Sequence, residues 1–368
     1  MDLAYSDDQT LFRNSVAEVL AGMAHDEGSD AARWRTFASL GWLALPFPEE
    51  TGGLSLGAVD LAILTEGFGR FDIRSAYHMS IVLSGGLITA LGLPAQRETW
   101  LPRLADGSVR IGLAYDGEAF EDPELDGVAA VRVADAEWRL NGRRTHVRDV
   151  DDAEAIIVPA RLAGETGAIG FFLISSDAPG VTIQTNPAAD GGRIGTLQLA
   201  GVAVGGSALL GGRAAVAETV AKVIDRAIVA SCSELVGSMD ALFAATRDYT
   251  AQRIQFGKPI AANQVIRHRL VDMAVACEEA RAITLRAAIL SAEDDPRFSS
   301  AAAGAKAKLY PAARALAEEA IQLHGAMGVT EELAIGRRLK RILALQASFG
   351  TPAFHLDRHA RLRTAAPA

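Results

Sequence analysis

The sequence predicts a multidomain α+β protein with an N-terminal helical domain, a middle β-barrel or sandwich, and a C-terminal antiparallel four-helix bundle. Apolar residues recur every third or fourth position up to about residue 108 and again from about residue 213. Short runs rich in β-forming residues fill the stretch between. Because 368 residues suffice for more than one core, we expect domains at residues 1–108, 109–212 and 213–368.

The first domain is predicted to be entirely helical. Ser6 and Gln9 form a capping box that opens the first helix, since each side chain can bond the other residue's backbone N–H. Residues 40–53, Leu-Gly-Trp-Leu-Ala-Leu-Pro-Phe-Pro-Glu-Glu-Thr-Gly-Gly, are punctuated by prolines and glycines and indicate a rigid connector. The other helices are expected at residues 31–40, 59–68, 75–91 and 97–105.

The middle domain is predicted from short runs that alternate in polarity or are rich in β-branched and aromatic residues. Turn formers separate these runs, among them Asn141-Gly142, Pro179-Gly180 and residues 190–192, Asp-Gly-Gly. Several short strands at this spacing predict a compact barrel or sandwich. The strands are expected at residues 110–114, 128–133, 138–140, 155–159, 169–174, 181–184 and 196–199.

The last domain is predicted to consist of long helices with short connections, which favours an antiparallel bundle. Gly257 and Pro259 lie between the first two helices, so neither helix can run through that turn. Residues 294–296 and 324–328 mark the later boundaries, and Thr330 is placed to cap the helix that follows it. The helices are expected at residues 214–249, 264–291, 299–323 and 331–346.

Composition narrows the classes of function. Hydrophobic residues make up 49% and charged residues 22% of the chain, which is an ordinary globular balance. A net charge of −9 argues against nucleic acid as a main partner. Cys232 and Cys277 lie within predicted helices and indicate buried thiols in a reducing compartment. With no basic signal region and no charge-free apolar run long enough to cross a membrane, we expect a cytoplasmic protein without a membrane partner or a metal site.

Residues 253–260, Arg-Ile-Gln-Phe-Gly-Lys-Pro-Ile, join the two longest predicted helices. An arginine beside such a turn is suited to bidentate pairing with a phosphate, although a single arginine there is equally an ordinary surface residue. With Gln264 and the helix after it, this stretch resembles the central signature of the acyl-CoA dehydrogenase family. Residues 320–330, Ala-Ile-Gln-Leu-His-Gly-Ala-Met-Gly-Val-Thr, resemble a second block of that family in the expected order. The resemblance covers nearly the whole chain and implies the family's three-part fold.

The resemblance also implies FAD as the cofactor and an acyl-CoA thioester as the substrate. In the family, FAD lies between the β-domain and the C-terminal helices, and its adenine and pyrophosphate reach the neighbouring subunit of a dimer. Carried over by position, Arg253 would pair with the pyrophosphate, while Phe256 and Gln264 would contact the adenosine end. The same dinucleotide would be lined from the other protomer by Gln322, Gly325 and Gly328. The alternative is a polar, solvated helix end at Gln322 and His324.

Two family motifs that contact the flavin ring are replaced in this sequence. Where members carry a Thr-Glu-Pro…Gly-Ser-Asp loop, residues 114–122 are Ala-Tyr-Asp-Gly-Glu-Ala-Phe-Glu-Asp. Where members carry Trp-Ile-Thr or Trp-Ile-Ser, residues 146–148 are His-Val-Arg. Carboxylates would repel a bound phosphate, so we interpret the acidic stretch as a solvated loop. Its acidic residues are Asp116, Glu118, Glu121 and Asp122.

The catalytic base of the family is also absent from its usual place. The family's reaction removes an α-proton from an acyl thioester while a hydride passes to the flavin, and the proton needs a positioned carboxylate. The common Tyr-Glu-Gly-Thr motif corresponds to residues 348–351, Ser-Phe-Gly-Thr, so Phe349 occupies the base position and cannot accept a proton. The other known position, on the helix before the Arg-x-x-Phe-Gly turn, is Ala227 here. Asp225 and Glu234 are candidates for a substitute base, or ordinary helix residues.

Three functions remain open. The first is α,β-desaturation of an acyl-CoA by an FAD-dependent acyl-CoA dehydrogenase, acting alone or as one subunit of a heteromer. The second is a non-catalytic partner subunit that lends FAD contacts to a catalytic paralogue, and the third is a flavin oxidase or hydroxylase of the same fold. The Phe-Gly at Phe349 and the His-x-x-x-His-Ala run at residues 355–360 resemble the small subunits of pimeloyl-CoA or steroid side-chain dehydrogenases. We expect a homo-oligomer, or a heterotetramer with a paralogous acyl-CoA dehydrogenase subunit.

Overall fold

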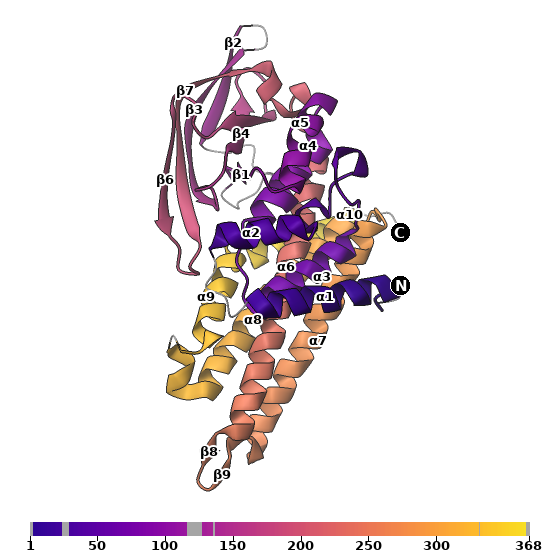
Figure 1. Ribbon diagram of the computed structural model, residues 1–368, viewed down its shortest axis with the longest axis vertical. Helices are drawn as coiled ribbons and strands as arrows, with labels where there is room; N and C mark the ends of the chain where they lie inside the picture. The colour runs from indigo at the N-terminus through magenta and orange to yellow at the C-terminus, as the bar shows by residue number, and fades with distance from the viewer. Residues whose placement is uncertain (1–2, 24–28, 116–126, 135–136, 331, 366–368) are drawn as a thin grey trace. The chain divides into compact units, whose positions relative to one another are not determined.

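The computed structural model describes residues 3–23, 29–115, 127–134, 137–330 and 332–365. Helices, then strands, then helices follow one another along the chain, which confirms the predicted α+β organisation (Figure 1). The α-helices are α1 (Asp7–Met23), α2 (Asp30–Ser39), α3 (Ala58–Phe71), α4 (Gly86–Leu91), α5 (Pro94–Ala105), α6 (Ala217–Gln252), α7 (Gln264–Ala292), α8 (Phe298–His324), α9 (Ala334–Gln346) and α10 (Pro352–Ala365). The strands are β1 (Ile111–Leu113), β2 (Val128–Ala134), β3 (Glu137–Arg148), β4 (Ala155–Leu162), β5 (Ile169–Ser175), β6 (Val181–Pro187), β7 (Arg193–Gly205), β8 (Ile254–Gln255) and β9 (Lys258–Pro259).

Contacts group the chain into two compact units. The bundle unit comprises Met1–Glu27, Ala58–Ile73 and Ile228–Ala368, and the sheet unit comprises Gly28–Gly57 and Arg74–Ala227. The bundle unit therefore holds α1, α3, α7 to α10 and most of α6, and the sheet unit holds α2, α4, α5 and strands β1 to β7. The N-terminal helices are shared between the two units.

Local signals decide where some helices begin. Ser6 Oγ accepts a hydrogen bond from the Gln9 N–H at 3.2 Å, and Gln9 Oε1 accepts one from the Ser6 N–H at 3.1 Å, which confirms the predicted capping box of α1. The predicted cap at Thr330 is wrong, because α9 begins only at Ala334. The Thr330 hydroxyl instead donates back to the carbonyl of Met327 at 2.9 Å, a local bond that competes with helix capping.

The helix predicted at residues 75–91 has two geometries. His78–Gly85 winds as a wider π-helix, and α4 continues from Gly86. Gly85 lies against the Phe47 ring, where a Cβ would come within 2.4 Å. Ser80 Oγ also accepts a hydrogen bond from the N–H of Ile111 at the start of β1, at 2.9 Å. The wider winding thus falls in the part of the segment that packs against Phe47 and bonds the start of β1.

The strands of the sheet unit form one sheet in the order β1-β4-β2-β3-β7-β6, with β5 paired to β4. Strands β3 and β7 are the longest and pair antiparallel over most of their length. Trp138 of β3 and Phe172 of β5 meet edge to face in the core, with ring centroids 5.6 Å apart. Aromatic pairs of this geometry stabilise a core beyond the area that they bury.

Asn141-Gly142 does not form the predicted turn, because β3 runs through both residues and pairs with β2 and β7. Asn141 Oδ1 accepts a hydrogen bond from the N–H of Gly201 at 2.7 Å. Gly142 lies at a β-bulge with φ 138°, and a Cβ there would come within 1.6 Å of the carbonyl oxygen of Gly127. Asn141 and Gly142 therefore meet the needs of a close backbone approach inside the sheet, and not those of a hairpin turn.

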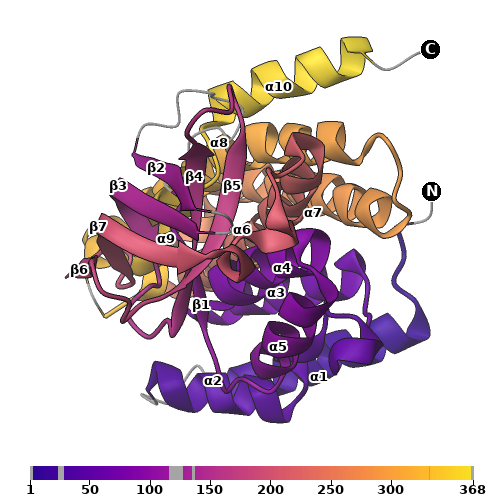
Figure 2. The same ribbon diagram turned by 90° about the horizontal axis from the view of Figure 1, so that it is seen from above.

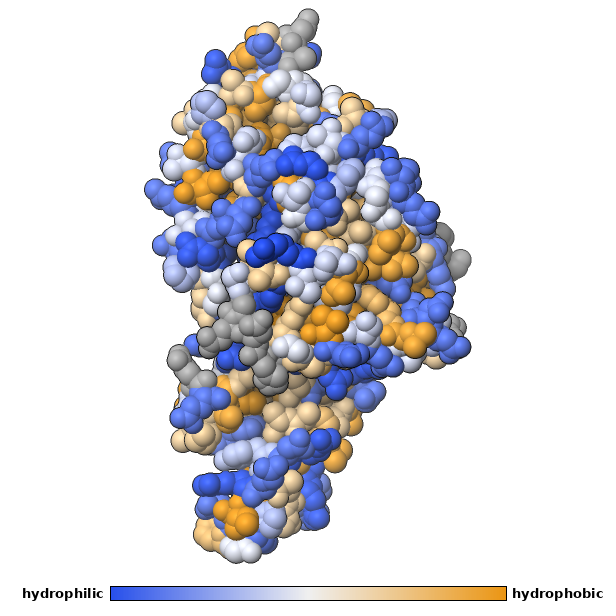
Figure 3. All heavy atoms as spheres, in the orientation of Figure 1, coloured by the Kyte–Doolittle hydropathy of each residue, from blue (hydrophilic) through white to orange (hydrophobic). Residues whose placement is uncertain are grey.

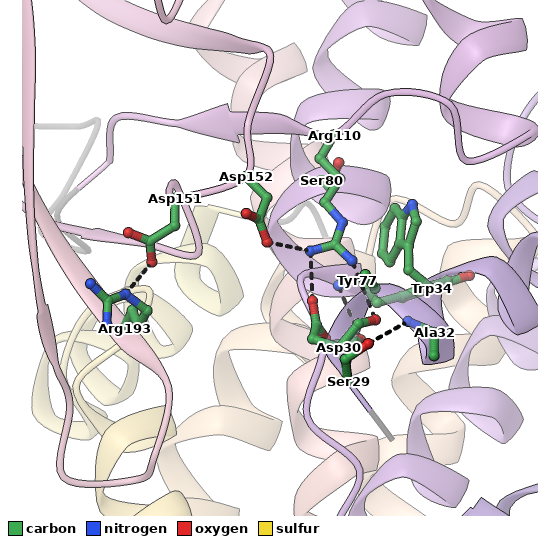
Figure 4. A network of polar contacts seen from close by, with 12 residues as sticks. Ser29, Asp30, Ala32, Trp34, Tyr77, Ser80, Arg110, Asp151, Asp152 and Arg193 are labelled. Atoms are coloured by element: carbon green, nitrogen blue, oxygen red, sulfur yellow. Dashed lines mark hydrogen bonds and ion pairs between the residues drawn. The ribbon is translucent and has the colours of Figure 1, made fainter. Parts of the chain in front are cut away.

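Arg110, directly before β1, ties α2 to the start of the sheet (Figure 4). Its Nη1 donates to Asp30 Oδ2 at 2.6 Å and to Asp152 Oδ2 at 3.3 Å. Its guanidinium carbon also lies 4.5 Å from the ring centroid of Trp34. A largely buried arginine with two carboxylates and an aromatic face is a firmer anchor than an exposed ion pair.

In the bundle unit, charged residues join the helices across their faces. Arg281 of α7 pairs with Glu66 of α3 at 2.8 Å and with Asp240 of α6. Arg13 of α1 contacts the same Glu66 at 3.4 Å. Gly237 lets α6 approach α3, since a Cβ there would come within 1.9 Å of the Glu66 carbonyl oxygen.

The last helix of the bundle unit, α10, lies beside α8 (Figure 2). Gly304 of α8 makes room for the His359 imidazole, whose Nδ1 donates to the carbonyl of Ser300 at 2.7 Å.

Helix α6 is long and apolar enough to cross a membrane by length and composition alone. Nevertheless, 78% of its most apolar window is buried in the fold, as expected of a core helix.

Candidate functional site

The predicted Arg-x-x-Phe-Gly turn is a two-stranded hairpin, β8–β9, at the end of the α6–α7 pair (Figure 1). Phe256 and Gly257 both have positive φ, at 52° and 76°, which is the pattern of a tight two-residue hairpin turn. Positive φ is costly for a phenylalanine and is typical of functional positions. The N–H of Arg253 donates to the Tyr249 carbonyl at 2.8 Å, and its carbonyl accepts from Ile260 at 2.9 Å, so its backbone is held at the base of the hairpin.

The side chains of this hairpin are directed into solvent. Phe256 is 99% exposed, and Ile254 beside it is 61% exposed. Figure 3 shows apolar side chains among hydrophilic ones at the end that carries this hairpin. Arg253 is also exposed, and its guanidinium makes no hydrogen bond or ion pair with any residue that the structure describes. The hairpin therefore presents to solvent both a guanidinium, which can pair with an anion, and an apolar ring.

Gln264 lies at the first position of α7, immediately after the hairpin. It is exposed, and its Nε2 lies 3.4 Å from His268 Nε2. No side chain caps this end of α7, because the Asn263 amide donates instead to the carbonyl of Ile260 at 3.2 Å. The end that follows the hairpin therefore presents backbone N–H groups and the positive end of a long helix dipole.

The second predicted block ends α8. Gly325 follows His324 with φ 62° and ψ −138°, a conformation open only to glycine, and it is exposed together with Gln322. Gly328 is buried, and a Cβ there would come within 2.8 Å of the carbonyl oxygen of Ile321. Both glycines are therefore required by the backbone path itself.

The two blocks meet through Tyr249 and His324. Their rings are stacked with centroids 4.4 Å apart, and Tyr249 Oη donates to the His324 carbonyl at 3.3 Å. His324 Nδ1 donates to the Ala320 carbonyl at 2.8 Å, which fixes the ring orientation. Tyr249 precedes Arg253 by one helical turn, so one chain places both blocks on adjoining surface. Tyr249 was absent from the residues predicted from sequence, and an aromatic residue one turn before the arginine was the available signal.

Phe349 is turned into the protein. It is 5% exposed, and its φ of 63° places it in the left-handed region. His355 Nε2 donates to the Phe349 carbonyl at 2.6 Å, whereas its Nδ1 has no hydrogen-bond partner among the described residues. Burial lowers the pKa of His355 to about 4, so the imidazole is neutral at pH 7.

The two candidate carboxylates are both buried. Glu234 is 2% exposed and accepts two hydrogen bonds from Arg341, at 2.7 Å from Nε and 3.2 Å from Nη2. A carboxylate held on both oxygens by one guanidinium favours a structural role over proton transfer. Asp225 is fully buried on the part of α6 that belongs to the sheet unit, and it too has interaction partners.

The segment that replaces the family's Trp-Ile-Thr lies at the end of β3. His146 is exposed with φ 58°, next to an irregularity in the pairing of β3 with β7. Arg148 donates to Asp190 at 2.6 Å, and the Asp190 side chain is completely buried. The charge of Arg148 is therefore neutralised within the sheet unit. The predicted acidic loop, with Asp116, Glu118, Glu121 and Asp122, lies outside the described residues.

Neither of the two cysteines has the exposed thiol of lowered pKa that a catalytic cysteine needs. Cys232 and Cys277 are free and buried, and burial raises the pKa of each to about 12. Across the part of the chain that the structure describes, no group of three or more His, Cys, Asp or Glu side chains is placed to hold a metal ion.

Comparison with known proteins agrees with this architecture. The family model for the acyl-CoA dehydrogenase N-terminal domain matches residues 6–108, and the model for the C-terminal domain matches residues 217–362. The human mitochondrial short-chain specific acyl-CoA dehydrogenase is 28% identical over 318 residues, which cover 84% of this chain and 77% of that protein. Members of this family are FAD-dependent oxidoreductases.

Solved structures show the same fold. Butyryl-CoA dehydrogenase from Megasphaera elsdenii superposes with a TM-score of 0.90 at 22% identity, covering 99% of this chain and 100% of that one. A chain of the ChsE4–ChsE5 complex from Mycobacterium tuberculosis superposes with a TM-score of 0.86 at 22% identity, covering 100% of both chains. From the two matching family domains and the order of its elements, the chain belongs to the acyl-CoA dehydrogenase family.

Proposed function

We propose that this chain takes part in the FAD-dependent α,β-desaturation of an acyl-CoA thioester as one subunit of a heteromer, with the base supplied by a paralogous subunit. One observation carries the proposal: Tyr249 and His324 join the two dinucleotide-binding blocks, while position 349 offers an inward phenyl ring. We infer that this chain retains the half of the site that a subunit would lend to its neighbour. The half that performs proton transfer is altered.

The residues fit the dinucleotide part of FAD. The free guanidinium of Arg253 suits a pyrophosphate, and exposed Phe256 offers an apolar face to an adenine. Gly325 and Gly328 allow a ligand to approach the backbone closely. When bound, FAD would supply the hydride acceptor of the reaction. The resemblance assigned Gln322 and the two glycines to a different protomer from Arg253. Because the two blocks adjoin within one chain, we infer instead that all four residues act from the same protomer on one dinucleotide.

The residues around the ring position support a division of labour between subunits. Phe349 cannot remove a proton, and both oxygens of Glu234 are engaged by Arg341. Arg148, which stands where members carry a small hydroxyl residue, is engaged by Asp190. ChsE4–ChsE5 is a complex of two proteins, and this precedent within the same fold supports a heterotetramer or other heteromer for our chain.

Co-expression with a paralogous acyl-CoA dehydrogenase subunit that carries the glutamate base tests this proposal. We expect the two chains to co-elute with bound flavin, detected by its visible absorption, and to desaturate an acyl-CoA. The chain purified alone should hold little flavin. Flavin-loaded, active protein from this chain alone would instead identify a self-sufficient enzyme, and rapid flavin reoxidation by oxygen with product formation would identify an oxidase or hydroxylase of this fold.

The location of the protein is part of the same proposal. Two free, buried cysteines support a reducing compartment, and we propose the cytoplasm. Fractionation of cells that express a tagged chain tests this location.

A further inference from the structure

Lys306 of α8 is fully buried beside the turn at residues 348–350. Its Nζ donates to the carbonyl of Ser348 and lies 4.3 Å from the ring centroid of Tyr310 and 5.6 Å from that of Phe349. No carboxylate of the described chain forms an ion pair with it. An ammonium without a counter-ion is uncommon inside a protein, because its desolvation is costly. Among the described residues, one carbonyl and two aromatic faces compensate this cost for Lys306.

The turn beside Lys306 is held at two successive carbonyls. Lys306 binds the Ser348 carbonyl from α8, and His355 binds the Phe349 carbonyl from α10 at 2.6 Å. Gly350 completes the turn with φ 88°, and a Cβ there would come within 3.1 Å of His355 Nε2. The backbone therefore directs the side chain at position 349 toward Lys306.

We propose that Lys306 is a positioning residue that holds the turn at the family's base position with side chain 349 directed inward. A carboxylate at position 349 would then form an ion pair with Lys306 and be neutralised, instead of serving as a base. The inference rests on the proposed function only in identifying position 349 as the place of the base. A glutamate carboxyl carbon reaches about as far from Cα as the centre of a phenyl ring. A glutamate at 349 would therefore direct its oxygens toward the Lys306 ammonium, which forms no ion pair with a carboxylate of the described residues.

Among the titratable groups of this cluster, which are Lys306, Cys232, Tyr310 and His355, Lys306 has the pKa closest to neutral. Burial lowers the pKa of Lys306 to about 7, raises that of Cys232 on α6 to about 12, and raises that of Tyr310 well above its usual value. His355 on α10 has a pKa of about 4, and Arg358 beside it stays charged. A carboxylate at 349 would move the Lys306 pKa back up toward its usual value.

The test is a double-mutant cycle on the full chain, read by urea unfolding without added flavin. Phe349→Glu and the matched neutral Phe349→Gln are each made with Lys306 intact and with Lys306→Met. With Lys306 intact, we expect the Glu variant to have an unfolding equilibrium constant about ten-fold lower than the Gln variant. With Lys306→Met, the order should reverse, because the buried carboxylate is then unpaired. An equal difference in unfolding equilibrium constant between the Glu and Gln variants, with Lys306 intact and with Lys306→Met, would overturn the proposal.

A pH series keeps the test decisive if Lys306→Met does not fold. The Phe349→Gln variant should gain stability as pH rises from 7 toward 10.5, because its unfolded state binds the lysine proton more tightly than its folded state. The Phe349→Glu variant should lose this rise, and an unchanged rise would contradict the ion pair. Desaturation gained by Phe349→Glu with Lys306 intact would also overturn the inward placement. Since unfolding needs no flavin or partner, a failed heteromer leaves this result unaffected.

Discussion

The rings of Tyr249 and His324 stack 4.4 Å apart at an angle of 24°, although 75 positions separate the two residues in the chain. Tyr249 lies one turn before the Arg253 hairpin, and His324 ends α8 immediately before the Gly325 turn. The stack joins the two sequence blocks that resemble the family's signatures, residues 253–260 and 320–330. It therefore positions the surface that we propose to act on a neighbouring subunit's flavin.

Tyr249→Ala should lower the flavin content of the co-purified heteromer several-fold, because the two blocks lose the contact that sets their relative position. Tyr249→Phe keeps the stack and loses only a 3.3 Å hydrogen bond, so its flavin content should stay near that of the unmodified chain. Visible absorbance per folded protein measures both. Full flavin content in a folded Tyr249→Ala protein would show that the stack does not position the site.

Arg253→Gln should weaken FAD binding by about ten- to a hundred-fold, the loss typical of a charge-assisted contact with a phosphate. The melting temperature without flavin should not change, since the guanidinium contacts none of the described residues. Arg247→Gln is the matched control, because Arg247 is exposed on the same helix end and pairs with Asp248. Flavin titration measures the difference, and equal effects at both positions would argue against a specific pyrophosphate contact.

Glu234→Gln should destabilise folding by about 3 kcal/mol, because it removes the negative charge that faces two nitrogens of the largely buried Arg341 guanidinium. Replacing both residues with Leu and Met should recover part of that loss. Urea unfolding measures the change. Lost turnover with unchanged stability would instead identify Glu234 as the base.

Stability should fall as pH drops from 6.5 to 4 in a way that depends on His355. The folded pKa of His355 is lowered to about 4 from 6.5, so the unfolded chain takes up the proton first and protonation favours unfolding. The contribution amounts to up to about 3 kcal/mol. His355→Gln retains a donor for the Phe349 carbonyl and should show a shallower pH dependence over this range. Identical profiles for the two proteins would contradict the buried, neutral imidazole.

The order of helices and strands was predictable because periodicity and punctuation are local properties of the sequence. The capping box at Ser6, the break at Gly257 and the boundary after His324 all lie within a few residues of their signals. The same local reasoning failed at Asn141-Gly142, where pairing with β2 and β7 overrides a strong turn signal. It also failed at Thr330, whose hydroxyl has two possible backbone partners.

The sequence alone determined the family and the three-part order of elements, and it supplied the two sequence blocks and the phenylalanine at position 349 on which our proposal rests. Only the tertiary structure decided that Tyr249 joins those blocks, that Arg341 pairs with Glu234, and that Lys306 binds the turn beside Phe349. These contacts connect residues far apart in the chain, and no local pattern specifies which buried polar groups will face one another. Packing determines which polar groups pair, because a buried charge without a partner is costly and few arrangements of the helices give every buried charge a partner.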